Sequence, residues 1–119
     1  MIKPIEHPEM VRVLCKPGET ILGELTPTDA HLLHMVIGIS GECGELLDAV
    51  KKSTIYQKTL DRENVVEELG DIEFYLEGLR QCLDITREET IAENIGKLAT
   101  RYKGFKYTDD QAQKRRDKN

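Results

Sequence analysis

Two pairs of carboxylates have the spacing expected for a shared metal ion. Glu42 and Glu45 are three residues apart, and so are Glu68 and Asp71. Residues three apart on a helix lie on the same face, so each pair presents two carboxylates together. If the two helices pack antiparallel with these faces in contact, all four carboxylates meet near the middle of a helical hairpin.

Four carboxylates in one place repel one another, and the repulsion raises their pKa values until protons are bound. A hard divalent cation removes this cost. Ligand sets made only of oxygen favour Mg²⁺, with Mn²⁺ as a substitute, over Zn²⁺, and Mg²⁺ commonly combines a few carboxylates with water and substrate phosphates. The alternative is that these are solvated surface acids, as most Glu residues are.

Glycines around the carboxylates weigh against that alternative. A Gly inside a helix costs about 1 kcal/mol relative to Ala, so a cluster of them indicates close packing or access for a ligand. The glycines are Gly38, Gly41 and Gly44 near the first pair and Gly70 within the second.

The carboxylates are expected on two long helices. Thr26-Pro27-Thr28-Asp29 predicts a helix start with Thr26 as N-cap, and Lys51-Lys52-Ser53 marks the end of this helix. Asp61 is expected to cap the second helix, after a loop over about residues 53–60. Apolar residues recur every three or four positions in both, which predicts a buried seam on each. On the first helix the predicted seam is Leu32, Val36, Ile39, Cys43, Leu46 and Val50, with a second apolar row, Leu33, Ile37 and Leu47, beside it. On the second helix the predicted seam is Val65, Leu69, Ile72, Leu76, Leu79 and Leu83.

A third helix is predicted from Thr86, which forms a capping box with Glu89, to Gly104. No strand-like alternation occurs, so the fold class is all-α, a helical hairpin plus a third helix. Residues 1–25 are expected to form an N-terminal extension with a short helix over about residues 8–14 and then a loop. Residues 26–107 form the helical domain, with Phe105 and Tyr107 folding back on its core, and residues 108–119 form a charged tail, either solvated or a helix that contacts a partner.

Length and composition narrow the class of protein. The chain has 119 residues, which suits one domain. It has 17 Lys and Arg residues and 22 Asp and Glu residues, which gives a net charge of −5. An acidic chain is unlike proteins that bind nucleic acid or anionic membranes mainly by electrostatics. The three cysteines show no disulfide or zinc pattern, and no apolar stretch is long enough for a signal peptide or membrane span. We therefore expect a cytoplasmic protein that binds neither nucleic acid nor membrane.

Three segments carry a pattern more specific than the carboxylate spacing. They are G-I-S-G-E-C-G-E-L-L-D-A-V-K-K (38–52), V-E-E-L-G-D-I-E-F-Y (66–75) and N-I-G-K-L-A-T-R-Y (94–102). From about residue 30 to 105 the chain resembles the MazG-type nucleotide pyrophosphohydrolases of the all-α NTP pyrophosphatase superfamily. The family signature, E-x-x-E followed after a gap by E-x-x-D, is matched without departure by Glu42, Glu45, Glu68 and Asp71.

The resemblance implies Mg²⁺-dependent hydrolysis of a (d)NTP to the monophosphate and pyrophosphate, in nucleotide pool sanitation or balance. It implies that the four carboxylates bind the metal and that Glu42 or Glu45 also acts as the catalytic base. It further implies a homo-oligomer, a dimer or tetramer built on a four-helix bundle, which agrees with the broad apolar faces of both long helices. Glu67 is interpreted as a surface acid.

Other residues are candidate substrate contacts. Asn94, Lys97 and Arg101 form one stripe on the third helix that could face phosphates, with Tyr102 beside it; the alternative is a solvated basic face. Lys51 and Lys52 are further candidates for phosphate contacts; the alternative is that they are cations that stabilise a helix C-terminus. His34 and Tyr75 are candidates for contacts with a base; the alternative is that they are packed side chains. The structural alternative for His34 is a partly buried, hydrogen-bonded histidine, and Cys43 is interpreted as a core residue.

A second hypothesis from a different class is a non-catalytic helical module for regulation or assembly, which binds nucleotides or metal without hydrolysis. The intact set of four carboxylates favours the enzyme. The sequence leaves open the preferred base and sugar, activity on alarmones or damaged nucleotides, which phosphorus is attacked, and dimer against tetramer.

Overall fold

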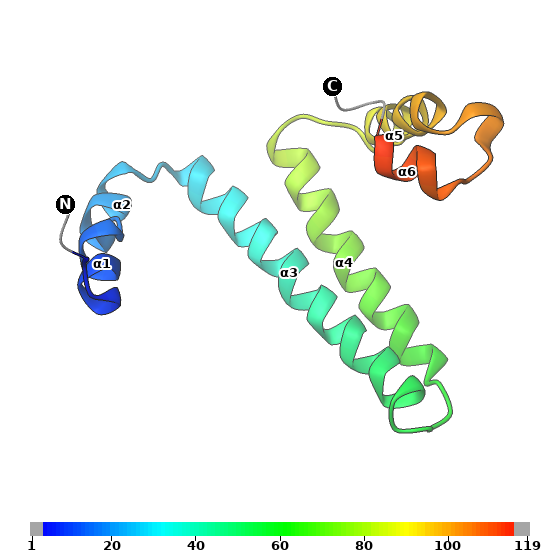
Figure 1. Ribbon diagram of the computed structural model, residues 1–119, viewed down its shortest axis with the longest axis horizontal. Coiled ribbons are helices and arrows are strands. Elements are labelled where there is room, and N and C mark those ends of the chain that lie inside the picture. Colours follow the sequence, from blue (N-terminus) through cyan, green and yellow to red (C-terminus); the bar gives the residue numbers. More distant parts are fainter. Residues whose placement is uncertain (1–3, 116–119) are drawn as a thin grey trace.

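Helices make up nearly all of the regular structure in this chain. The structure is a computed structural model, and it describes residues 4–115. Its elements are α1 (His7–Leu14), α2 (Gly18–Glu24), α3 (Pro27–Thr54), α4 (Arg62–Cys82), α5 (Arg87–Arg101), the short 3-10 helix η1 (Lys103–Phe105) and α6 (Asp109–Lys114) (Figure 1). No strand occurs within residues 4–115, which confirms the all-α class. Over the same range, no helix combines the length and apolar character needed to cross a membrane.

The predicted N-caps set the starts of the long helices. The Thr26 hydroxyl accepts from the Asp29 N–H at 3.1 Å, and the Thr26 N–H donates to the Asp29 carboxylate at 3.1 Å, which completes a capping box for α3. Asp61 caps α4 by accepting from the Asn64 N–H at 3.1 Å. Thr86 caps α5 by accepting from Glu89 N–H at 3.0 Å. The three predicted helix starts are therefore confirmed.

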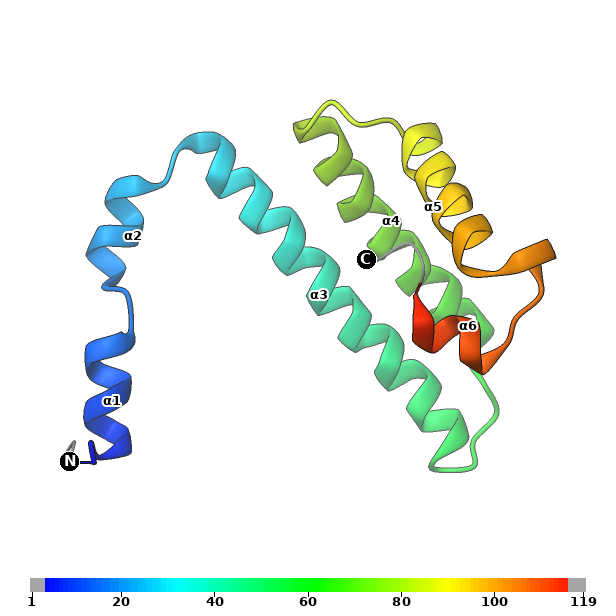
Figure 2. The same cartoon turned by 45° about the horizontal axis from the view of Figure 1, so that its top comes forward.

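Helices α3 and α4 form a long antiparallel hairpin, and their contact is the main tertiary packing of the described chain (Figures 1 and 2). The contact uses part of the predicted seams. Their half-buried members are Leu32, Ile39 and Leu46 of α3 and Val65, Ile72, Leu76 and Leu79 of α4. Met35 and Ala49 of α3 are each only 5% exposed, and Glu68 of α4 is 8% exposed. Predicted seam residues that are exposed instead are Val36, Cys43, Val50, Leu69 and Leu83, together with the neighbouring row Leu33, Ile37 and Leu47.

The predicted seams therefore agree with the structure only in part, and the interpretation of Cys43 as core is wrong. The hairpin contact therefore combines half-buried seam residues with the carboxylates, and other apolar residues on the same two helices are turned outward. Periodicity finds an apolar stripe on a helix but does not say which surface covers it.

Two glycines allow a close approach of the paired helices. A Cβ at Gly38 would overlap the Tyr75 ring, and a Cβ at Gly78 would lie 2.5 Å from the Met35 sulfur. The packing reason predicted for the glycines is thus found at Gly38. At the other three, Gly41, Gly44 and Gly70, no atom lies within 4 Å of an added Cβ.

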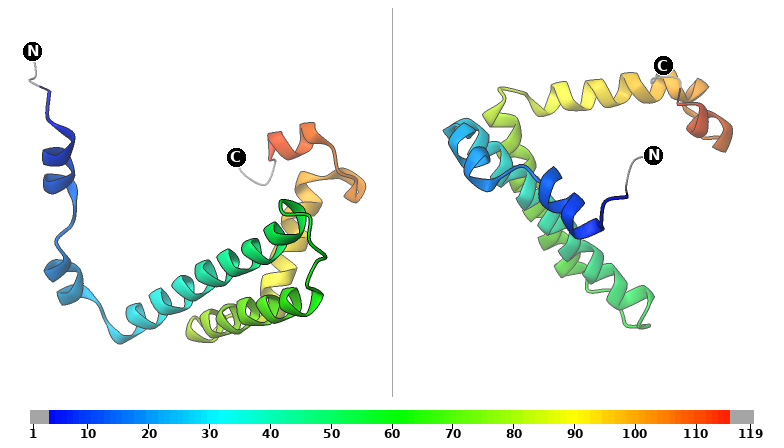
Figure 3. Two further views of the ribbon diagram at one scale, coloured as in Figure 1. Left: turned by 90° about the horizontal axis from the view of Figure 1, so that it is seen from below. Right: turned by 60° about the vertical axis from the view of Figure 1, so that its left-hand side comes forward.

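The N-terminal segment forms two helices that extend away from the hairpin (Figures 2 and 3). The predicted short helix is present as α1. The predicted loop after it is wrong, because residues 18–24 form α2. Pro17, with φ −61° and ψ 139°, precedes the first turn of α2 as its N-cap, and Gly18 and Gly23 are accommodated near its two ends.

The C-terminal segment packs on itself rather than on the hairpin. Helix α5 ends at Arg101, and Gly104 follows in the left-handed conformation with φ 62°. Phe105 and Tyr107 remain 72% and 68% exposed; the Tyr107 ring lies 5.6 Å from that of Tyr102 and its hydroxyl donates to Asp109. The predicted fold-back onto the core is therefore wrong, because η1 and α6 pack against α5 instead. The predicted tail contains a short helix, α6, capped by Thr108.

Candidate metal centre

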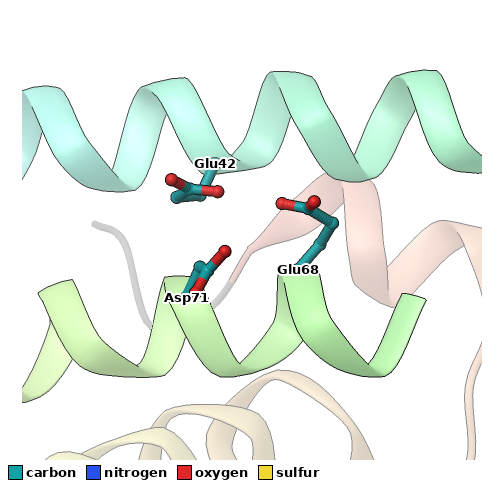
Figure 4. Close-up of side chains that lie close together, drawn as sticks. All are labelled: Glu42, Glu68 and Asp71. Carbon is teal, nitrogen blue, oxygen red and sulfur yellow. The ribbon is translucent and has the colours of Figure 1, made fainter. Parts of the chain in front are cut away.

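Three carboxylates from the two paired helices converge between them. Glu42 projects from α3, and Glu68 and Asp71 project from α4 into the same space (Figure 4). Each offers an oxygen within 4.8 Å of the others. Glu68 is buried, whereas Glu42 and Asp71 are half-buried. Three oxygens at this separation suit a single cation.

The helix register explains how these side chains come together. Met35, Glu42 and Ala49 are seven residues apart, which is close to two helical turns, so all three point toward α4. Glu68 occupies the corresponding buried row of α4. The carboxylates therefore take positions that apolar residues commonly fill in the middle of a helix–helix contact, with Glu68 buried and Glu42 and Asp71 half-buried.

The electrostatics of Glu68 reflect this position. Its pKa is raised to about 7, first by burial, then by a hydrogen bond to Glu42 and by the negative charges of Glu42, Asp71 and Glu45. Its Oε2 atom is buried and has no hydrogen-bond partner. A buried carboxylate oxygen without a partner is costly, and a cation supplies the missing interaction. The residues thus fit a divalent metal ion.

Glu45 lies at the edge of this centre. Its charge acts on Glu68, but its side chain is exposed and is not one of the three converging carboxylates. Positions three apart on a helix differ by about 60° in direction, so when Glu42 faces α4, Glu45 turns toward solvent. The structure therefore brings together three of the four predicted ligands and leaves the fourth beside them.

Lys51 and Lys52 have local partners at the far end of α3. Lys52 forms an ion pair with Asp48 at 3.2 Å, and the Lys51 ammonium lies 5.7 Å from the centre of the Tyr56 ring. Nine residues of helix separate Lys51 from Glu42, a rise of about 14 Å. These contacts agree with the alternative in which both lysines stabilise the helix C-terminus.

The basic stripe of α5 is not brought to the metal centre of its own chain. Helix α5 leaves the end of α4 and carries η1 and α6 at its far end (Figure 3). Lys97 and Arg101 are half-buried on it, Asn94 is exposed, and Tyr102 packs against Tyr107.

The two predicted base contacts, His34 and Tyr75, lie together along the hairpin on the side of the carboxylates away from Lys51 and Lys52. The rings of His34 and Tyr75 meet edge to face, with centroids 6.1 Å apart, and Tyr75 presses against the backbone at Gly38. The packing interpretation of Tyr75 therefore fits the structure.

A hollow of about 460 Å³ opens next to these rings. It is lined by His31, Met35, Phe74, Glu77, Gly78 and Gln81. Sequence reasoning missed three of its polar and aromatic residues, Phe74, Glu77 and Gln81. Their spacing of three and four residues along α4 was the signal that could have placed them on one face.

The comparison with family models decides the family. The model of the MazG nucleotide pyrophosphohydrolase domain matches residues 31–105. The chain belongs to the MazG family. The match runs from the first turns of α3 to the end of η1, so it contains the metal centre and the hollow, whereas α1, α2 and α6 lie outside it. No curated protein and no solved structure gives a match. MazG membership confirms the resemblance found in the sequence and supports a nucleotide pyrophosphohydrolase activity.

Proposed function

We propose that this MazG protein is a Mg²⁺-dependent nucleoside triphosphate pyrophosphohydrolase that converts a (d)NTP to the (d)NMP and pyrophosphate. The observation that carries the proposal is the convergence of Glu42, Glu68 and Asp71 between α3 and α4. We further propose that it acts in the cytoplasm, in nucleotide pool sanitation or balance.

Glu42, Glu68 and Asp71 would hold the metal ion, with Glu45 at its edge. Ligands made only of carboxylate oxygens favour Mg²⁺, or Mn²⁺ in its place. When bound, such an ion neutralises the charge on phosphate oxygens during phosphoryl transfer. The buried, unpartnered oxygen of Glu68 supports this assignment.

We assign the role of catalytic base to Glu45, with Glu42 as the other candidate. Glu45 is exposed beside the three ligands, so a water molecule and the substrate can both reach it. It takes a proton from the attacking water as the new bond from oxygen to phosphorus forms. The phosphoanhydride bond then breaks, and pyrophosphate and the monophosphate separate. Attack at either the α or the β phosphorus gives these products.

We propose that the chain works as a homo-oligomer, a dimer or tetramer with a four-helix bundle. Its radius of gyration is 20.6 Å, whereas a compact domain of this length has about 13.5 Å. Within the described residues, Met35 and Ala49 are the only buried apolar side chains. The outward apolar residues of α3 and α4 then pack against a second copy of the chain, since large exposed apolar surfaces are typical of protein interfaces.

An oligomer also gives the α5 stripe a role. Because α5 projects away from its own hairpin, we propose that Asn94, Lys97 and Arg101, with Tyr102 beside them, contact the phosphates of a nucleotide near the boundary between two copies. An arginine suits bidentate phosphate contacts and a lysine acts as a point charge.

Product analysis tests the proposed reaction. The purified protein is incubated with each common NTP and dNTP, with Mg²⁺ or with EDTA, and the products are separated by anion exchange. Glu42→Gln and Asp71→Asn are tested beside Glu67→Gln, a change at an exposed acid on the same helix as Asp71. We expect monophosphate and pyrophosphate with Mg²⁺ only, lost in the first two variants and kept in the third. Metal binding without turnover of any nucleotide would favour the non-catalytic module.

A further inference from the structure

The hollow lined by His31, Met35, Phe74, Glu77, Gly78 and Gln81 lies between the same two helices as the metal centre. Phe74 follows Asp71 by one helical turn, so one edge of the hollow adjoins the carboxylates. Met35 and Gly78 are each seven residues from a carboxylate, Glu42 and Asp71 respectively, which is a rise of about 10 Å. This separation is of the same order as that between the phosphates and the base of a nucleotide.

The hollow has a flat aromatic side chain with room for a second ring. Phe74 is 68% exposed, and its contact with Tyr75 is edge to face, with centroids 5.1 Å apart and planes at 88°. A T-shaped contact leaves much of the Phe74 surface uncovered. Stacking of a base on such an aromatic side chain is sequence-tolerant, so discrimination between bases has to come from the polar residues.

The polar residues of α4 in the hollow present hydrogen-bond acceptors. The Glu77 carboxylate accepts from Gln81 Nε2 at 2.9 Å and from Arg80 Nε at 3.2 Å. These two hydrogen bonds, from Gln81 first and from Arg80, and the charge of Arg80 hold the pKa of Glu77 below its usual value, so it is ionised at neutral pH and can only accept. Because Gln81 spends a donor on Glu77, its carbonyl oxygen is left as a further acceptor.

We infer that this hollow holds the nucleobase and that Glu77 and Gln81 select cytosine or adenine over uracil or thymine. Cytosine and adenine carry an exocyclic amino group, a donor, on the edge where uracil and thymine carry a carbonyl oxygen. Two acceptors facing a carbonyl oxygen leave polar groups unpaired, which is the strongest basis for rejecting a close analogue. The inference rests on the proposed function, because it assumes that a nucleotide is bound with its phosphates at the metal centre.

The test compares dCTP with dUTP, two substrates that differ mainly at this edge of the base. Values of kcat/KM for both are measured with Mg²⁺ for the wild type, Glu77→Gln and Glu73→Gln. Glu73 is the matched control, because its carboxylate also lies near Arg80, at 3.9 Å, without lining the hollow. Gln81→Met, which removes the other acceptor at similar volume, is a second test in case Glu77→Gln does not fold, and circular dichroism monitors folding of all variants.

We expect the wild type to favour dCTP by at least about tenfold, the scale of one well-placed hydrogen bond to a charged group. Glu77→Gln and Gln81→Met should each reduce this preference by about tenfold, and Glu73→Gln should leave it unchanged. Equal turnover of dCTP and dUTP by the wild type, or a preference that survives both Glu77→Gln and Gln81→Met, would overturn the inference while the proposed function stands. Absence of Mg²⁺-dependent turnover of every common nucleotide would instead overturn the proposed function and this inference with it.

Discussion

The contact between Gly38 and Tyr75 makes a quantitative prediction about the hairpin. Gly38→Ala adds a methyl group that overlaps the Tyr75 ring, including its Cγ. The ring cannot move aside freely, because it also contacts Phe74 and His34. Gly41→Ala adds the same group at a position with no atom within 4 Å, so it is the matched control within the same helix.

The expected magnitudes follow from two opposing effects. Replacing a helix-interior Gly by Ala stabilises by about 1 kcal/mol at both positions. Overpacking at Gly38 costs about 1–3 kcal/mol, so Gly38→Ala should be about 1–3 kcal/mol less stable than Gly41→Ala. For a chain of this size, the difference corresponds to roughly 4–12 °C in Tm. Thermal and urea unfolding are followed by circular dichroism at one protein concentration, since oligomerisation makes Tm depend on concentration.

A double variant distinguishes the clash from other causes. Tyr75→Leu removes the ring, so Gly38→Ala should cost less in the Tyr75→Leu background than in the wild type. Equal stability of Gly38→Ala and Gly41→Ala, or an unchanged cost after removal of the ring, would refute the assignment of Gly38 as the close contact of the hairpin.

Three other predictions concern the metal-free centre, the oligomer and the helix cap. The folded-state pKa of Glu68 is about 7, above its unfolded value, so its contribution to stability is full at low pH and is lost as pH rises through about 7. The Tm measured in EDTA should therefore fall between pH 5 and 7, and Glu68→Gln should reduce this fall. An identical pH profile for the wild type and the variant would contradict this prediction. Leu47→Glu places a charge on the outward row of α3, where Leu47 is 69% exposed, and should lower the mass measured by light scattering toward that of one chain; an unchanged oligomer would exclude this row from the interface. Thr26→Ala removes the capping box of α3 and should cost about 1 kcal/mol in urea unfolding, whereas no change would show that the cap adds nothing to the packed hairpin.

Local signals predicted the helices well. The N-caps at Thr26, Asp61 and Thr86 each depend on a hydrogen bond within one turn of the chain, so their sequence pattern contains all the residues involved. The exception is α2, where Gly18 and Gly23 suggested a loop. A helix of seven residues tolerates them near its ends, where backbone groups remain open to solvent.

Features that depend on contacts between helices were harder to predict. Val36 and Leu69 have the spacing of the predicted hairpin seams but are exposed, whereas Ile39 and Ile72 of the same seams are half-buried. The hairpin contact also contains Glu42 and Glu68, and the cost of burying carboxylates is understandable only with a cation. The convergence of the carboxylates was inferred from spacing, but the outward position of Glu45 required the actual rotation of α3 relative to α4.

The most direct test of the central claim is a titration of the protein with Mn²⁺ by calorimetry, at pH 7.5 on the wild type, Glu68→Gln and Glu67→Gln, and at two pH values below 7 on the wild type. The wild type should bind a metal ion at each centre, and affinity should weaken by about tenfold per pH unit as pH falls below about 7, because Glu68 must lose its proton to bind. Glu67→Gln, at an exposed acid next to the centre, should bind like the wild type, and Glu68→Gln should bind at least about tenfold more weakly. Equal affinity of Glu68→Gln and the wild type would contradict the assignment of these carboxylates as the metal centre.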